Sequence, residues 1–218
     1  MTTTPDDAGR GSRPRPALSR DRIVATALAM IDRDGLDKTS MRRLGAELGA
    51  DPMAVYHYFP NKAALLDGVV EQVYRAMTVP PDDDRPWQEY ARDSADAMRA
   101  TLLRHPRALP AIATRPVTSP VVLVMIESLA ARLMRAGADA STSLDVVNCV
   151  AMFTIGHALA EAGEPVGGDS GAAVDVPALV ALLPTLAAAL ADGYGFDFDR
   201  QYRLGLDLLI DGLSRRLG

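Results

Sequence analysis

The sequence predicts an all-α protein in which a small N-terminal domain is joined by a linking helix to a larger helical domain. Only 5% of the 218 residues are aromatic, and Ala, Leu and Arg are abundant, a composition that favours helices over strands. Apolar residues recur at helical spacing along most of the chain, with no internal repeat and no segment of strand pattern. The PPDDDRP stretch at 80–86 interrupts this spacing, and we place the domain boundary there.

The first two helices are expected in the small N-terminal domain before this boundary, which we call the head. Residues 1–18, rich in Pro, Gly and Thr, are expected to form a flexible arm. A helix follows from Ser19 and ends at Gly35, because glycine is favoured just past a helix. Thr39 is expected to cap a second, short helix that stops at Gly49.

A third and a fourth helix complete the head. Asp51 and Pro52 form a strong start signal, because Asp caps free amides and Pro fits the first helical turn. The third helix is therefore expected from Pro52 to about Phe59. Asn61 can cap a fourth helix, which runs to Met77 and would link the head to the body.

The larger domain after the boundary, which we call the body, is expected to hold four long helices and one shorter apolar segment. Caps and apolar spacing place the long helices at 87–103, 119–136, 143–163 and 199–217. Between the first two, several prolines predict a loop with one short helical turn. The 164–175 segment is expected to be mobile, and the apolar stretch 177–190 is expected to be a helix kinked at Pro184.

Composition excludes several classes of protein. Hydrophobic residues at 48% and charged residues at 23% rule out a disordered tail, a collagen-like repeat and a disulfide scaffold. We find no run of 18 uncharged apolar residues that would predict a membrane span, and the polar N-terminus has no signal-peptide core. The single cysteine, Cys149, is expected to be a buried, inert thiol. Together these features favour the cytoplasm.

The net charge of −5 is unevenly divided along the chain. Residues 1–62 hold 10 Lys and Arg against 8 Asp and Glu, whereas residues 63–218 hold 13 against 20. A weakly basic head on an acidic body fits contact with a polyanion through one end. Ordinary scatter of charge would give the same division, so charge alone does not separate these interpretations.

The head has the arrangement of a helix-turn-helix, in which short helices are joined by tight turns and the last helix enters the major groove of DNA. Tyr56 and His57 are large and polar-tipped, and such side chains reach phosphate oxygens and base edges. The helix start at Asn61-Lys62 combines free amides with a lysine, which suits a phosphate. The head is therefore a candidate DNA-binding domain.

At these residues the chain resembles the TetR family of bacterial transcriptional repressors. The resemblance is carried by Gly35-Leu36, TSMRRL at 39–44, LGAD at 48–51 and YHYFPNKAALL at 56–66. It implies a helix-turn-helix domain over 19–66 with a linking helix over 61–77. Members of the family usually carry Ser or Thr where this chain has Asp51, which caps equally well but brings a negative charge near the DNA.

The resemblance also assigns DNA contacts to individual residues. Arg42 matches a position that reads a guanine or binds phosphate. Met53 and Ala54 match base-facing positions, where apolar side chains suit a thymine methyl group. The matches to phosphate-contacting positions are Thr39, Ser40, Tyr56, His57 and Lys62. Alternatives stay open, since Tyr56 could pack in the small core and Arg42 and Arg43 could both be solvated charges. The arginines that could reach the minor groove from the arm, or contact nothing, are Arg10, Arg13 and Arg15.

The body is similar to the ligand-binding and dimerisation domain of the tetracycline-repressor subgroup, which implies that role for residues 85–218. The similarity is carried by ATRP at 113–116, FTIG at 153–156 with Ala158-Leu159, and LLIDGL at 208–213. It implies a homodimer in which helices 143–163 and 199–217 of both copies form a four-helix bundle, although an intramolecular core would explain their apolar stripes equally well. Such a dimer would read half-sites about 34–36 Å apart in a palindromic operator.

A helical body rich in Ala, Leu, Met and Val implies a largely apolar cavity with few polar anchors. The residues expected to line it are Thr114, Arg115, Pro116, Met125, Leu129, Phe153 and His157. Arg115 and His157 are the expected anchors, although His157 could equally be a core or interface histidine. The position of the subgroup's metal-binding histidine falls on Ala111, which cannot ligate a metal. We therefore expect no metal, no cofactor and an inducer other than a magnesium–tetracycline chelate.

No feature of the sequence predicts an enzyme. The three histidines form no metal-spacing cluster, and the chain has neither a phosphate-binding glycine loop nor a nucleophile elbow. The sequence therefore predicts a dimeric repressor that binds a DNA operator and is released by a small-molecule inducer. The alternative is a DNA-binding architectural or protein-interaction regulator without an inducer, whose body would be filled.

Overall fold

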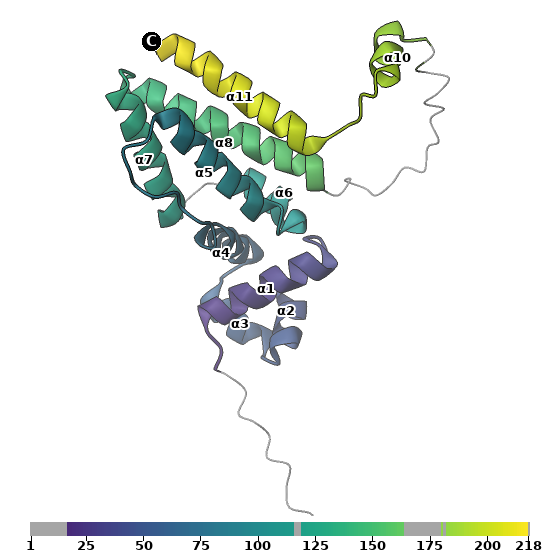
Figure 1. Cartoon of the computed structure of the whole chain (residues 1–218). Coiled ribbons are helices and arrows are strands. Elements are labelled where there is room, and N and C mark those ends of the chain that lie inside the picture. Colours follow the sequence, from purple (N-terminus) through teal and green to yellow (C-terminus); the bar gives the residue numbers. More distant parts are fainter. Residues whose placement is uncertain (1–16, 116–118, 164–179, 181, 218) are drawn as a thin grey trace, which may run out of the picture.

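The computed structural model describes residues 17–115, 119–163, 180 and 182–217, and every regular element in these segments is a helix (Figure 1). The predicted all-α class is confirmed. The head lies at one end of an elongated molecule and the body at the other, with a linking helix between them. The arm expected over 1–18, with its three arginines, lies outside the described residues up to residue 16.

Three helices build the head and a fourth connects it to the body. Their bounds are α1 (Arg20–Asp34), α2 (Met41–Leu48), α3 (Pro52–Tyr58) and α4 (Lys62–Arg75). Two predicted caps form, because the Asp51 carboxylate accepts from the Met53 amide and the Asn61 side chain from the Ala64 amide, both at 2.8 Å.

The cap of α2 differs from the prediction by one residue. Ser40, not Thr39, caps this helix, since its hydroxyl accepts from the Arg43 amide at 3.3 Å. Thr39 is buried and donates its hydroxyl to the Gly35 carbonyl oxygen at 3.1 Å. The Thr39 side chain therefore closes the turn between α1 and α2 from inside.

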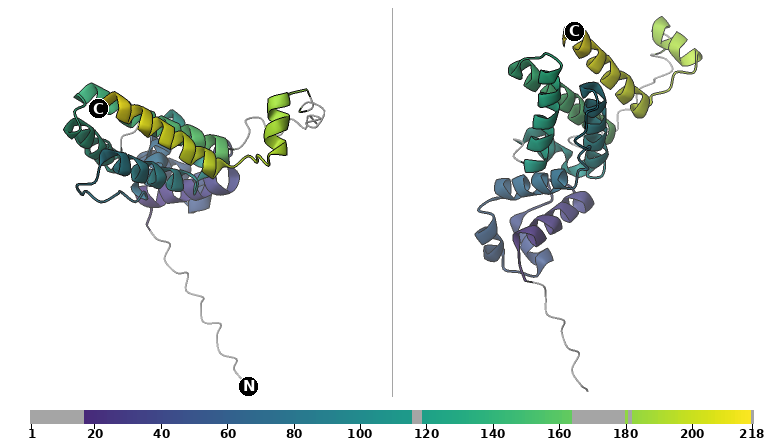
Figure 2. Two further views of the ribbon diagram at one scale, coloured as in Figure 1. Left: turned by 45° about the horizontal axis from the view of Figure 1, so that its top comes forward. Right: turned by 60° about the vertical axis from the view of Figure 1, so that its left-hand side comes forward.

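The body is a helical bundle around α8 (Ala140–Ala162). This helix packs against α5 (Trp87–Leu102), α6 (Leu109–Thr114), α7 (Pro120–Arg135) and α11 (Phe198–Leu217). A 3₁₀ turn, η1 (Pro106–Ala108), precedes α6 and contacts α1 of the head. Figure 2 shows α10 (Pro184–Ala191) standing apart from the bundle, and none of its residues is buried.

Three predicted elements of the body begin or continue differently. α8 starts at Ala140 rather than Ser143, because the Asp139 carboxylate caps it by accepting from the Thr142 amide at 2.9 Å. The loop expected between α5 and α7 holds both η1 and α6. Pro184 opens α10 instead of kinking a longer helix, since proline fits the first helical turn. The segment expected to be mobile, 164–175, lies outside the described residues.

One side of α8 is covered by its neighbours and the other is exposed. By length and composition this helix could cross a membrane, but its buried stripe, through Val146, Val147 and Val150, packs inside the bundle. Cys149 lies on the exposed side, so the expectation of a buried thiol was wrong. Val147 and Val150 of the buried stripe lie close to Cys149 in the chain, but the Cys149 side chain points away from that stripe.

Buried side chains connect the head to the body through α4. One apolar cluster extends from Leu44 in the head, through Val69 in α4, to Met98 in α5 and Ile112 in α6. A second cluster joins α5, α7, α8 and α11 around Tyr202. Because α4 is packed against both ends of the molecule, a displacement of α4 in the body would also move the head.

Candidate DNA-binding face and ligand cavity

α3 turns one side to the core of the head and the other to solvent. Val55 is fully buried, whereas Met53 is 64% and Tyr56 42% exposed, and His57 is exposed as well. Positions 53, 56 and 57 share one face of the helix because they are three and four residues apart. Tyr56 therefore does not fill the small core, and Ala54 lies half-buried at the edge of the exposed face.

The close packing of α2 against α3 sets the direction of that face. A Cβ atom at Gly45 would lie 3.2 Å from both the Ala50 carbonyl oxygen and the Pro52 Cα, so only glycine fits without a shift of backbone. In the turn that follows α2, Gly49 supplies a left-handed conformation with φ of 63°. α2 and α3 together occupy the end of the molecule furthest from the body (Figure 1).

The two arginines of α2 have different surroundings. Arg43 donates to the Asp34 carboxylate at 2.8 Å and to the Lys38 carbonyl oxygen at 2.6 Å. Asp34 also accepts a hydrogen bond from Arg33. The bond from Arg33, and to a smaller extent that from Arg43, holds the pKa of Asp34 below its usual value. Arg42 is exposed and its guanidinium has no partner among the residues that the structure describes, so Arg42 is the arginine of α2 that is free to meet a phosphate or a base.

The remaining predicted DNA contacts are divided between surface and interior. Ser40 is half-buried at the start of α2, whereas Thr39 is only 1% exposed and does not reach the surface. Lys62 donates one hydrogen bond to the Leu36 carbonyl oxygen at 3.1 Å, which leaves two of its three N–H groups for another acceptor. The structure thus brings Ser40, Arg42 and the exposed side of α3 to one end of the molecule, and it places Thr39 inside.

A cavity of about 130 Å³ lies in the body between α4, α5, α7 and α8. Its walls are mainly apolar and include Met98, Met125, Leu129 and Ile155. Met152 lines the cavity and is also exposed, so the cavity opens on this side of α8.

The polar residues of the wall are Tyr74 from α4, Ser94 from α5, and Asn148 and Thr154 from α8. Within the described part of the chain, the Tyr74 hydroxyl and the Ser94 Oγ are buried and have no hydrogen-bond partner, whereas Thr154 donates its hydroxyl to the Val150 carbonyl oxygen at 2.9 Å. Burial raises the pKa of Tyr74 to about 12, so this hydroxyl keeps its proton at neutral pH. No Asp, Glu, Lys, Arg or His side chain is among the described residues that line the cavity.

Two of the seven residues expected in the cavity are there, namely Met125 and Leu129. Thr114 donates its hydroxyl to the Pro110 carbonyl oxygen at 2.7 Å within α6 and does not line the cavity. Arg115 contacts α4 instead, and Pro116 lies outside the described residues.

Phe153 and His157 lie on the side of α8 that faces α11. The Phe153 ring stacks on Tyr202 with centroids 5.7 Å apart, and His157 meets Tyr202 edge-on at 5.2 Å. Burial and the positive charge of Arg99 lower the pKa of His157, while Glu161, 3.6 Å from its Nδ1, opposes them. His157 is therefore packed in an aromatic cluster and is not an anchor of the cavity.

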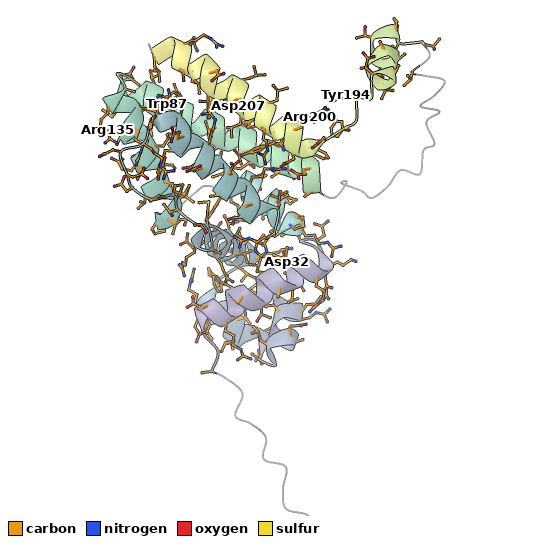
Figure 3. The ribbon with its side chains drawn as sticks, in the orientation of Figure 1. Asp32, Trp87, Arg135, Tyr194, Arg200 and Asp207 are labelled. Atoms are coloured by element: carbon orange, nitrogen blue, oxygen red, sulfur yellow. The ribbon has the colours of Figure 1, made fainter. Side chains whose placement is uncertain are left out.

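Polar contacts hold the head against the body. Asp32, at the end of α1 (Figure 3), lies with its carboxylate 2.9 Å from His105 Nδ1, and its carbonyl oxygen accepts from Arg107 at 3.3 Å. Arg115 donates to the Ala63 carbonyl oxygen at 3.0 Å and to the Asp67 carboxylate on α4. These contacts tie α1 and α4 to the η1–α6 segment.

No three His, Cys, Asp or Glu side chains gather to hold a metal ion within the part of the chain that the structure describes. Ala111, at the position of the subgroup's metal-binding histidine, is buried in the apolar core of α6 and does not line the cavity.

Most of the cavity wall was not predicted from the sequence, including Tyr74, Ser94, Met98 and Thr154. These residues lie on helices whose apolar spacing also fills the ordinary core, so periodicity alone does not separate a wall from a packed interior. The one local signal was Tyr74, a residue with a polar tip on the otherwise apolar side of α4.

Comparison with known proteins matches both halves of the chain. The sequence profile described as "Bacterial regulatory proteins, tetR family" matches residues 23–69, and the profile described as "Tetracyclin repressor-like, C-terminal domain" matches residues 79–217. The HTH-type transcriptional repressor DrrR1 of Streptomyces coeruleorubidus is 30% identical over 223 aligned positions, which cover 96% of this chain and 82% of the relative.

Solved structures show the same architecture. The TetR family protein ActR of Streptomyces coelicolor, in complex with (S)-DNPA, superimposes with a TM-score of 0.75 and 29% identity, over 93% of this chain and all of that one. BioQ, solved with its natural double-stranded DNA operator, superimposes with a TM-score of 0.67 and 26% identity, over 91% of this chain and 99% of that one.

Proposed function

This chain belongs to the TetR family of bacterial transcriptional regulators, and from that premise we propose that it is a dimeric cytoplasmic repressor, which binds a palindromic operator and is released by a small, largely apolar ligand. Members of this family are DNA-binding regulators and not enzymes.

The exposed side of α3 is the observation that carries the DNA-binding part of the proposal. Met53, Tyr56 and His57 point to solvent from a helix of seven residues whose opposite side is buried. Large side chains left exposed on such a short helix find partners in base edges and phosphate oxygens. Arg42 on the adjacent helix adds a positive charge without an internal partner.

Exposed apolar residues on α8 and α11 support the dimer. These two helices pack side by side (Figures 1 and 2), and their exposed side chains include Leu144, Leu159, Leu204 and Leu208. An apolar surface of this kind is the usual mark of a protein–protein contact. A second copy that covers it by two-fold symmetry would place two α3 helices on one DNA duplex.

Release by a ligand follows from the position of α4. This helix begins beside the head and carries Tyr74 on the cavity wall near its other end, about 20 Å away at the rise of an α-helix. A ligand that binds better when α4 and the head are displaced lowers the affinity for DNA, and by linkage DNA lowers the affinity for ligand equally. The cavity favours this mechanism over a regulator with a filled body and no inducer.

Selection of random DNA duplexes by the purified full-length protein, at a stated near-physiological salt concentration, tests the proposal. We expect a two-fold symmetric motif with half-sites about one helical turn apart. If a folded, dimeric protein enriches no sequence, the proposed repressor function is wrong.

The selected duplex then tests the contact face. We expect Arg42→Ala to lower the affinity and to reduce the slope of log affinity against log salt by about 1, because one phosphate contact is lost. Tyr56→Ala should also weaken binding without unfolding the protein.

Arg135→Ala is the matched control for Arg42→Ala, because Arg135 is an exposed arginine at the end of the body far from the head (Figure 3). It should leave the affinity and the salt slope unchanged. Wild-type binding by both Arg42→Ala and Tyr56→Ala would show that the contact face is elsewhere.

A further inference from the structure

Two residues on the cavity wall carry a hydroxyl group that has no hydrogen-bond partner among the described residues. Tyr74 is 1% and Ser94 8% exposed, and neither hydroxyl bonds to a protein group in the segments that the structure describes. A buried polar group without a partner is unfavourable and uncommon in proteins. Both residues line the same cavity, so a molecule bound there would supply the missing partner.

The charge on that molecule is restricted by the rest of the wall. Among the residues that the structure describes, no ionisable side chain other than Tyr74 lines the cavity, and the raised pKa of Tyr74 keeps it neutral. A carboxylate or ammonium group would be buried there without a counter-charge, which is far less favourable than burial of a neutral group. A metal chelate would also find no carboxylate, imidazole or thiolate ligand on the described wall.

The volume of the cavity also restricts the size of the ligand. The cavity of about 130 Å³ is close to the roughly 150 Å³ of engineered apolar cavities that bind benzene. The buried part of a ligand is therefore about one ring in size, and a larger molecule would extend past Met152 at the mouth.

We infer that the cavity binds an uncharged, metal-free molecule whose buried part is a single apolar ring with a carbonyl or hydroxyl oxygen that hydrogen-bonds to Tyr74 and Ser94. This inference rests on the proposed function, because the same molecule would be the ligand that releases DNA. Tyr74 belongs to α4, so the hydrogen bond would reach the linking helix directly.

Three probes of similar shape test the inference on the full-length protein without DNA. Acetophenone has a ring and a carbonyl oxygen, α-methylstyrene replaces that oxygen by a methylene group, and benzoate carries a charge. We expect isothermal titration calorimetry to show acetophenone binding about three- to tenfold more tightly than α-methylstyrene, the usual effect of one neutral hydrogen bond. Benzoate should bind at least about a hundredfold more weakly than acetophenone.

Variants that remove only the hydroxyl groups identify the anchors. We expect Tyr74→Phe and Ser94→Ala to weaken acetophenone binding and to reduce the ratio of acetophenone affinity to α-methylstyrene affinity. Comparison of both probes on both the variant and the wild type isolates the contribution of the hydrogen bond. Ser119→Ala is the matched control, since the Ser119 Oγ is also buried without a partner but does not line the cavity. It should bind all three probes as the wild type does.

Equal binding of benzoate and acetophenone, an unchanged preference in both hydroxyl variants, or no binding of any probe would overturn the inference. The DNA selection is independent of these titrations, so a protein that binds acetophenone as expected but selects no DNA would remove the proposed function and leave the ligand class standing.

Discussion

Arg42 and Arg43 are neighbours in the chain, yet only one is free to bind a ligand. Arg43 is held by Asp34 and by the Lys38 carbonyl oxygen, and Lys62 is partly engaged by the Leu36 carbonyl oxygen. These bonds shape the turn between α1 and α2. The same residue type therefore supports the head at one position and faces solvent at the next, and hydrogen bonds from distant residues decide which.

His157 makes the stability of the body depend on pH. Its pKa is lowered by burial and by the charge of Arg99, so the folded protein binds a proton less readily than the unfolded chain. The stability contributed by neutral His157 is complete above the unfolded value of 6.5 and is lost as the pH falls through the folded pKa. Between pH 7.5 and 5.5 we expect the urea midpoint to fall less in His157→Gln than in the wild type.

His57→Gln is the control for this measurement, because His57 is exposed on α3. It should keep the pH dependence of the wild type, while carboxylates elsewhere affect all three proteins alike. If His157→Gln and the wild type lose the same stability over this range, His157 is not the group that titrates.

At the scale of the element, the start of α3 combines a cap with an unfavourable charge. Asp51 accepts from the Met53 amide at 2.8 Å, so Asp51→Ala should cost about 1 kcal/mol of stability. Asp51→Ser keeps a capping oxygen and removes a negative charge near the DNA. We expect it to retain wild-type stability and to bind the selected duplex about two- to fivefold more tightly at low salt.

A helix cap in the body separates the effect of a lost cap on stability from an effect on DNA binding. Asp139 caps α8 through the Thr142 amide, far from the head, so Asp139→Ala should lower the thermal midpoint without changing DNA affinity per dimer. If Asp51→Ser binds DNA no more tightly than the wild type, the charge at position 51 does not face the phosphates.

At the scale of the whole molecule, the exposed side of α8 and α11 is the proposed dimer contact. Leu208 is 62% exposed on α11, and a glutamate there would be buried without a partner in the dimer. We expect Leu208→Glu to raise the dimer dissociation constant about a hundredfold or more in sedimentation equilibrium. DNA affinity should fall with it, because a monomer reads only one half-site.

Leu123→Glu provides the comparison. Leu123 is 50% exposed on α7, which is neither of the two helices of the proposed dimer contact. This variant should stay dimeric and bind DNA normally. A Leu208→Glu protein as dimeric as Leu123→Glu would place the contact between copies on another surface.

The all-α class, most of the helices and the family could be predicted from the sequence alone. Caps such as Asp51 and Asn61 and the apolar spacing act between residues a few positions apart, so they can be seen without knowledge of the fold. One error was also local, because at α2 Ser40 caps the helix and the neighbouring Thr39 turns inward.

The side chains that surround the cavity could not be predicted from the sequence, because their positions depend on how the helices pack. Phe153 and Thr154 are neighbours on α8, yet one packs on Tyr202 beside α11 and the other lines the cavity. Arg115, expected as a ligand anchor, instead binds α4. Whether an apolar helical position meets a neighbour or a void depends on where four other helices lie. That arrangement is set by packing between distant segments, which no local pattern records.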